Sequence, residues 1–230
     1  LRLGIDSMST GTKHTISAFD DDMDEIRGLI AEMGARAESA LVAAMKALHE
    51  HDTDAATAIR AQDKIIDALE TDVERLVVRT IALRAPMADD LRELIAALKM
   101  SAVIERIGDY AKNIAKRVPQ MSGKIPSSAM VQLGRMGEIV VEMIRTAMDA
   151  YAKRDVDLAR AVTVRDDIVD QLNKDLFVDF VAYVVKNPAN ATEVAHLLFT
   201  AKNLERIGDH TTNVAQMIYF TETGENLPDA

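Results

Sequence analysis

Cysteine is absent from the 230 residues, and aromatic residues make up only 4% of them. The lack of cysteine excludes disulfide bonds, thiolate metal sites and a cysteine nucleophile, and it is compatible with a reducing cytoplasm. Few aromatic residues, only 5 prolines and a high aliphatic share suit packed helices better than strands. The composition therefore predicts an all-α fold.

Long uncharged hydrophobic runs are also missing. The most apolar stretch, LFVDFVAYVV at 176–185, contains an aspartate and is shorter than the roughly 18 residues of a membrane helix. The net charge of −10, from 27 Lys and Arg against 37 Asp and Glu, would repel a nucleic acid or an anionic lipid surface. Neither direct membrane insertion nor nucleic-acid binding is expected. The sequence also has no glycine-rich phosphate loop or nucleophile elbow.

Apolar residues recur at alternating steps of four and three, which is typical of amphipathic helices packed nearly parallel. Turn and capping signals separate six such segments. The sequence therefore predicts helices over 20–51, 54–82, 88–117, 127–153, 155–185 and 190–220. In the first of these the expected core seam is Ile26, Ile30, Met33, Ala37, Ala40, Ala44 and Leu48, and in the third it is Leu91, Ile95, Leu98 and Ala102.

A repeat organises the chain: IERIGDYAKN at 104–113 returns as LERIGDHTTN at 204–213. Further pairs, 103 residues apart, extend the repeat over both halves, so we predict two pseudo-symmetric three-helix bundles. The expected division is an N-terminal tail (1–19), a first bundle (20–118), a linker (119–126), a second bundle (127–220) and a C-terminal tail (221–230). Residues 1–7 are expected to be a cloning remnant before a natural start at Met8.

The repeated motif carries acidic residues at a helical spacing. Side chains four apart share a helix face, so Glu105, Asp109 and Asn113 form one stripe in line with the expected seam. The second copy forms the same stripe with Glu205, Asp209 and Asn213. The second helix of each half adds an acidic pair at the same spacing, Asp63 with Asp67 and Asp166 with Asp170. Four carboxylates are thus expected to converge in each half, where they need positive charge.

Two interpretations of these clusters stay open. The carboxylates could be solvated or paired with Arg106 and Arg206, or they could form a cation site on facing helices. An all-oxygen ligand set favours hard cations such as iron, manganese, magnesium or calcium over structural zinc.

Four further residues of the motif could support such a site. Gly108 and Gly208 stand in mid-helix, where glycine costs about 1 kcal/mol relative to alanine, so either a neighbouring helix packs there or an ion approaches closely. Asn113 and Asn213 could orient a carboxylate of the site or bind the ion through the amide oxygen. They could also form ordinary interhelical hydrogen bonds.

With its doubled E/D-x-x-x-D pairs and its doubled E-R-I-G-D-x-x-x-N motif, the chain resembles the PhoU family from about residue 13 to residue 220. The resemblance implies a cytoplasmic regulatory adaptor, held at the inner membrane by its partners. Those partners would be the ATPase subunit of the phosphate ABC transporter and a phosphate-sensing histidine kinase. The adaptor would repress the phosphate-starvation regulon when phosphate is plentiful.

The resemblance also implies a metal cluster, with iron among the candidates, at the E/D-x-x-x-D positions. Carried over to this sequence, the ligands would be Asp63, Asp67, Glu105, Asp109, Asp166, Asp170, Glu205 and Asp209. A homodimer is a further assembly open to such a protein. The alternative function is a carboxylate-bridged metal oxidoreductase, which would normally need two Glu-x-x-His pairs; the chain has one, at Glu193 and His196.

Overall fold

The computed structural model describes residues 9–121 and 127–228, most of which are helical. Six long helices follow one another along the chain, and no strand occurs within these two ranges. The long helices are α1 (Ser9–Glu50), α2 (Thr53–Arg84), α3 (Asp89–Ala115), α4 (Ser127–Lys153), α5 (Val156–Lys186) and α6 (Ala191–Thr223), and two short 3-10 helices are η1 (Val118–Gln120) and η2 (Pro188–Asn190). The all-α prediction is confirmed.

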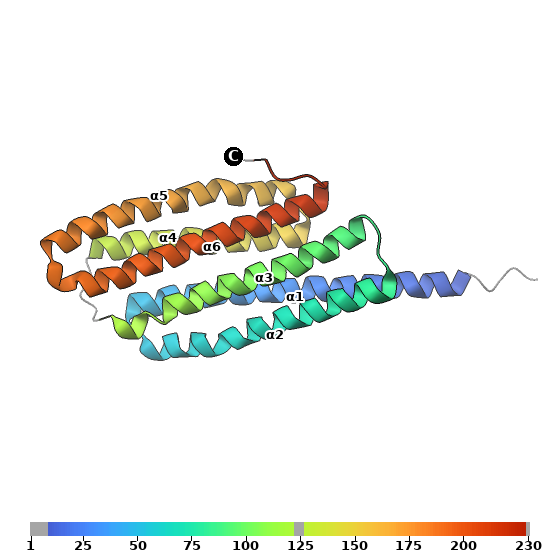
Figure 1. The fold of residues 1–230 in the computed structure, drawn as a ribbon, viewed down its shortest axis with the longest axis horizontal. Helices are drawn as coiled ribbons and strands as arrows, with labels where there is room; N and C mark the ends of the chain where they lie inside the picture. Colours follow the sequence, from blue (N-terminus) through green and yellow to red (C-terminus); the bar gives the residue numbers. More distant parts are fainter. Residues whose placement is uncertain (1–8, 122–126, 229–230) are drawn as a thin grey trace, which may run out of the picture.

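The six helices form two three-helix bundles that lie side by side (Figure 1). Helices α3 and α6 pack against each other in the middle of the molecule, and α1 packs against α4. Helices α2 and α5 lie at the outer edges, each against the other two helices of its own half. The predicted pair of pseudo-symmetric bundles is confirmed, and the motif helices of both halves are neighbours.

The turn that opens the second helix of each half has the same geometry in both copies. The Oδ1 atom of Asp52 accepts hydrogen bonds of 3.0 and 2.9 Å from the first amides of α2, and Asp155 caps α5 with bonds of 2.9 and 3.0 Å. The residues before these caps, His51 and Arg154, have φ values of 55° and 54°. The capping aspartates therefore start both helices after the same left-handed residue.

Two glycines let α1 and α4 approach each other, and they do so reciprocally. Gly34 of α1 faces Met148 of α4, and Gly137 of α4 faces Met45 of α1. A Cβ atom on Gly137 would lie 2.9 Å from the Met45 Cε, and one on Gly34 would overlap the Met148 thioether. These glycines serve close packing between the halves.

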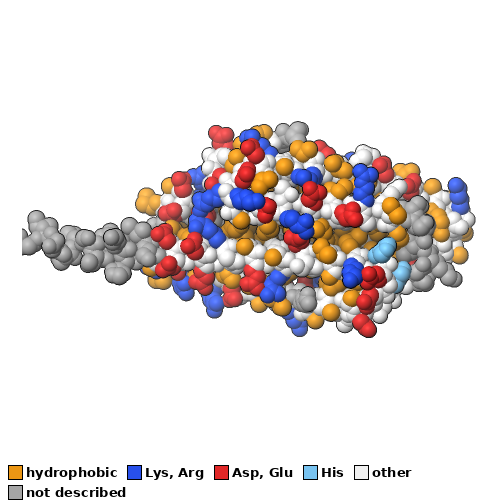
Figure 2. Space-filling view, turned by 180° about the vertical axis from the view of Figure 1, so that it is seen from behind, with side chains coloured by type: hydrophobic (Ala, Val, Ile, Leu, Met, Phe, Trp, Pro, Cys, Tyr) orange, Lys and Arg blue, Asp and Glu red, His pale blue; other side chains and the backbone are white. Residues whose placement is uncertain are grey.

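The surface on the side opposite to that of Figure 1 is a mixture of charges. Acidic and basic side chains are interspersed over this face, with hydrophobic side chains between them (Figure 2). On this face, lysine and arginine side chains therefore lie close to aspartate and glutamate side chains, without a large patch of one sign.

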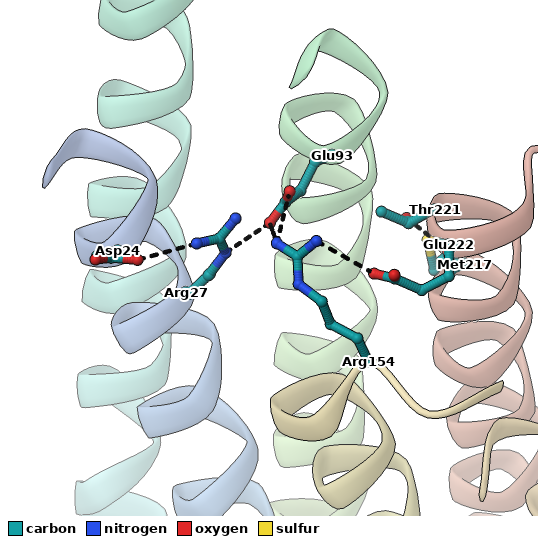
Figure 3. A network of polar contacts seen from close by, with 7 residues as sticks. All are labelled: Asp24, Arg27, Glu93, Arg154, Met217, Thr221 and Glu222. Carbon is teal, nitrogen blue, oxygen red and sulfur yellow. Dashed lines mark hydrogen bonds and ion pairs between the residues drawn. The ribbon is translucent and has the colours of Figure 1, made fainter. Parts of the chain in front are cut away.

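A network of ion pairs ties the two halves together near the N-terminal end of α3 (Figure 3). Glu93 of α3 accepts a 2.7 Å hydrogen bond from Arg27 of α1 and bonds of 3.3 and 3.2 Å from Arg154, which follows α4. Arg154 also approaches Glu222 of α6 at 3.9 Å, and Arg27 reaches Asp24 at 2.9 Å. Because the Glu93 side chain is only 14% exposed, its two arginine partners offset the cost of burying it.

The core follows the predicted seam in the first helix but not in the third. In α1 the seam is buried except for the partly buried Ala40. In α3 the prediction was wrong: the buried stripe begins at Leu94 and Ala97, whereas Leu91 and Ile95 are 37% and 38% exposed. Apolar residues occupy several adjacent faces of this helix, so spacing alone could not choose between them. As a result, Glu105 lies beside the core and not within it.

The predicted boundaries hold within three residues for most helix ends. The N-terminal tail at 1–19 was wrong, because α1 already begins at Ser9, and α6 continues three residues into the predicted C-terminal tail. The predicted linker at 119–126 starts within η1, and its residues 122–126 lie outside the described ranges, as do residues 1–7.

Candidate functional site

The first acidic cluster contains a cation of the chain's own. Asp63 of α2 is 8% exposed, and the Lys112 ammonium of α3 donates to both Asp63 and Asp109. Although burial lowers the pKa of Lys112, its bonds to these two carboxylates raise it overall. Sequence reasoning missed Lys112; its place three residues after Asp109, on the same helix face, was the available signal. The other two predicted residues, Asp67 and Glu105, have no ion pair among the described residues.

The remaining carboxylates of this cluster repel one another. Burial raises the pKa of Glu105 from 4.5 to about 7, and the charges of Asp109 and Glu70 add to the shift. Burial and the charge of Asp63 raise the pKa of Asp67 as well. Lys112 therefore neutralises part of the cluster, and Glu105 and Asp67 still favour a proton or another cation.

The second cluster has a different composition. Thr212 occupies the position that corresponds to Lys112, so no lysine bridges Asp166 and Asp209 there. Burial raises the pKa of Asp166 to about 6; the Thr212 hydroxyl opposes this rise, and Asp209 adds to it. The Oδ1 atom of Asp166 is buried and accepts no hydrogen bond from the described residues. This half therefore holds a buried carboxylate oxygen whose neighbouring hydroxyl, that of Thr212, forms no hydrogen bond of good geometry with it.

Gly208 leaves room for that carboxylate. A Cβ atom on Gly208 would lie 2.8 Å from Asp166 Oδ1, so the aspartate of α5 approaches the backbone of α6 directly. Gly108 has a different neighbour, because its Cβ atom would lie 2.8 Å from the Ile66 side chain. The two motif glycines thus admit a carboxylate in one half and an isoleucine in the other.

The predicted supporting arginines differ as well. Arg206 lies 3.7 Å from Asp209, and Glu205 pairs with Lys202 instead. Arg106 is exposed and forms no ion pair within the described residues. In the second half a motif arginine therefore pairs with a carboxylate of the acidic stripe, whereas in the first half Lys112 pairs with the carboxylates instead.

The two motif asparagines do not bind the acidic stripes. The Asn113 side chain accepts a 3.1 Å hydrogen bond from Lys116, and the exposed Asn213 lines a groove between α3 and α6. Between the two clusters, the rings of Tyr110 and His210 stack with their centroids 5.4 Å apart. Burial, followed by the charge of Arg106, lowers the pKa of His210, so this contact between the halves favours a neutral imidazole.

The structure brings the predicted carboxylates onto neighbouring helices, but it does not gather them around one point. Within residues 9–121 and 127–228, no three histidine, aspartate or glutamate side chains converge closely enough to hold one ion. The metal site therefore stays a prediction. None of the described helices combines the length and the apolar character needed to cross a bilayer.

Comparison with protein families places both halves in one family. The PhoU domain model matches residues 30–118 and 133–218, so it covers most of each three-helix bundle. A protein of Zymomonas mobilis named phosphate-specific transport system accessory protein PhoU homolog is 47% identical over 94% of this chain and 91% of its own length. A Caulobacter vibrioides protein with the same name is 40% identical, over 94% of both chains.

Solved structures give the same result. The crystal structure of PhoU from Pseudomonas aeruginosa matches with a TM-score of 0.87 and 32% identity, over 90% of this chain and all of that one. The structure titled phosphate transport system regulatory protein PhoU, from Streptococcus pneumoniae, matches with a TM-score of 0.85 and 25% identity, over 91% of this chain and 99% of that one. The similarity thus extends over nearly the full length of both chains.

Proposed function

This chain belongs to the PhoU family, and from that premise we propose that it represses the phosphate-starvation regulon when phosphate is plentiful. It has a regulatory role in phosphate transport and is not an enzyme, as the names of its relatives and the family indicate. In our proposal it links the ATPase subunit of the phosphate ABC transporter to a phosphate-sensing histidine kinase. It works in the cytoplasm and reaches the inner membrane through these partners.

The observation that carries this proposal is the duplication itself. Both halves match the same domain, and the motif helices α3 and α6 lie together in the middle of the molecule. Two related but unequal halves give one protein two distinct helical surfaces, which an adaptor between two partners needs. The oxidoreductase alternative has no comparable support, because the family consists of regulatory accessory proteins.

Co-purification tests the adaptor role. The tagged protein is recovered from cells grown in phosphate-rich medium, and the bound proteins are identified by mass spectrometry, with an untagged strain as the control. We expect the transporter ATPase and the histidine kinase among the specific partners; recovery of neither would overturn the proposal. Light scattering on the purified protein separately tests whether it forms a homodimer.

We also propose that a hard cation binds the acidic clusters, more readily in the second half. All the candidate ligand atoms are oxygens, which suit iron, manganese, magnesium or calcium, and the buried Asp166 Oδ1 accepts no hydrogen bond of good geometry from the described residues. Asp170, Glu205 and Asp209 would complete that ligand set. In the first half Lys112 bridges carboxylates of α2 and α3, so an ion there would have to displace the ammonium from between the two helices. In the second half Lys202 and Arg206 each pair with one residue of their own helix and leave Asp166 to an ion.

Metal analysis of matched variants tests this difference. The purified protein is incubated with Mn²⁺, desalted and analysed by mass spectrometry of the metal, and circular dichroism checks the fold of each variant. Asp209→Ala should remove more bound Mn²⁺ than Asp109→Ala, and both proteins should stay folded. Equal losses would contradict the proposed difference, and absence of bound Mn²⁺ from the unmutated protein would contradict a manganese site.

A further inference from the structure

An apolar groove runs along the surface between the first half of α3 and the last half of α6. It measures about 930 Å³, and its apolar lining includes Leu91, Ile95 and Val103 of α3 and Met217 and Phe220 of α6. Leu91, Ile95 and Phe220 are 37%, 38% and 40% exposed. Of the residues that spacing predicted for the core of the third helix, Leu91, Ile95 and Ala102 thus line a surface groove, whereas Leu98 packs against the core.

The charges that line this groove are all positive. Arg92 and Lys99 of α3 belong to its lining, which includes no aspartate or glutamate. Lys99 is exposed and has no ion pair among the described residues. Arg92 lies 5.8 Å from the centre of the Phe220 ring, and its carboxylate partner Asp89 is 86% exposed. On a chain with a net charge of −10, this lining is a local exception.

The repeat shows that the fold does not require these residues. At the corresponding positions of the second motif helix, Ala195 stands for Ile95 and Phe199 stands for Lys99. The other half therefore builds the same bundle with a smaller side chain and without the cation. Ile95 and Lys99 are therefore not needed to build the bundle, and the corresponding end of α6 carries a different pair, the exposed Phe199 with Arg117 stacked on its ring.

We propose that this groove binds an amphipathic helix of a partner protein, with carboxylates beside the apolar face of that helix. A helix is the element that packs between two antiparallel helices, with its side chains seated in their grooves. Residues Leu91 to Val103 extend about 18 Å along α3, enough for roughly three turns of a partner helix. Carboxylates of the partner would pair with Lys99 and Arg92. The inference rests on the adaptor function and gives the chemistry of one of its partner surfaces.

The test uses two synthetic helical peptides of 14 residues with identical leucine faces. In one the flanking positions are glutamate, in the other they are lysine, and binding of each fluorescein-labelled peptide is measured by fluorescence anisotropy. General attraction to a protein of charge −10 favours the lysine peptide, so a preference for the glutamate peptide must come from local charge. We expect that preference, at least tenfold, and we expect it to weaken as salt is added.

Three variants locate the binding. Lys99→Glu should weaken binding of the glutamate peptide roughly fivefold, since one attractive charge pair becomes repulsive. The same variant should strengthen binding of the lysine peptide. Ile95→Asp should abolish binding of both peptides, with circular dichroism verifying the fold. Lys64→Glu on exposed α2 makes the same charge change outside the groove and should change the affinity less than twofold.

Four outcomes would overturn the proposal. These are failure of the glutamate peptide to bind, preference for the lysine peptide, equal effects of Lys64→Glu and Lys99→Glu, and a dimer that Ile95→Asp dissociates, because a second copy would then occupy the groove. The adaptor function is measured separately by a gene deletion. If the deletion releases the regulon while the peptide fails to bind, the groove proposal alone is wrong.

Discussion

Replacing Glu105 with glutamine should stabilise the protein at alkaline pH. Its pKa rises from 4.5 to about 7, and a shift of this size corresponds to about 3.4 kcal/mol at roughly 1.36 kcal/mol per unit. Because the side chain is only partly buried, solvent screening reduces this to about 1–2 kcal/mol. A raised carboxyl pKa means that the folded state binds the proton more tightly, so the ionised group destabilises the fold above pH 7.

That penalty is relieved as the pH falls from about 7 towards 4.5, and this determines the assay. Urea unfolding, followed by circular dichroism, is compared for the wild type and Glu105→Gln at pH 8, 6 and 4. The variant should gain about 1–2 kcal/mol at pH 8 and almost nothing at pH 4. Glu205→Gln is the matched control, and it should show no gain because Glu205 pairs with Lys202. A loss of stability in Glu105→Gln at pH 8, or a gain independent of pH, would refute the reasoning.

Three other predictions, which involve four substitutions, follow from contacts described above. Lys112→Met should lower the free energy of unfolding by about 2 kcal/mol at pH 7.5, because it leaves the buried Asp63 unpaired. Added Mn²⁺ should restore part of this stability. An unchanged midpoint of urea unfolding would contradict the prediction. Glu93→Gln should cost about 1–2 kcal/mol, since it weakens the bonds from its two arginine partners; a melting temperature within one degree of wild type would contradict it. Gly34→Ala should destabilise the fold by about 1–3 kcal/mol, because the new methyl group overlaps the Met148 thioether. Gly137→Ala should change stability little, because its methyl group meets the flexible end of Met45. Equal melting temperatures of the two variants would contradict this difference.

Much of the fold could be predicted because each element carried a local signal. Aspartate caps mark the starts of α2 and α5, and the duplicated motif predicted two bundles before any geometry was known. The start of α1 at Ser9 was missed because residues before 20 show little apolar periodicity. Helix α3 shows a different limit: its apolar residues fit two adjacent faces, and only packing against α6 and α1 decides which one is buried.

The clustering of the acidic residues could be predicted but not its charge balance, and their role as a metal site stays a prediction. Spacing placed Glu105 and Asp109 on one face correctly, and the raised pKa of Glu105 agrees with a crowded cluster. The pairing of Lys112 with Asp63 joins two helices, 49 residues apart, so no local spacing rule could give it. The repeat already aligns Thr212 with Lys112, but the consequence for charge became clear only when the structure showed Lys112 bridging two carboxylates.

The most direct test of the account is the activity of an alkaline-phosphatase reporter, driven by the phosphate-starvation regulon, in a strain that lacks this gene and grows in phosphate-rich medium. The adaptor account predicts high activity in the deletion strain, and low activity again when the intact gene is restored. Activity that stays low in the deletion strain, while starvation still induces the reporter, would contradict a repressive role for this protein.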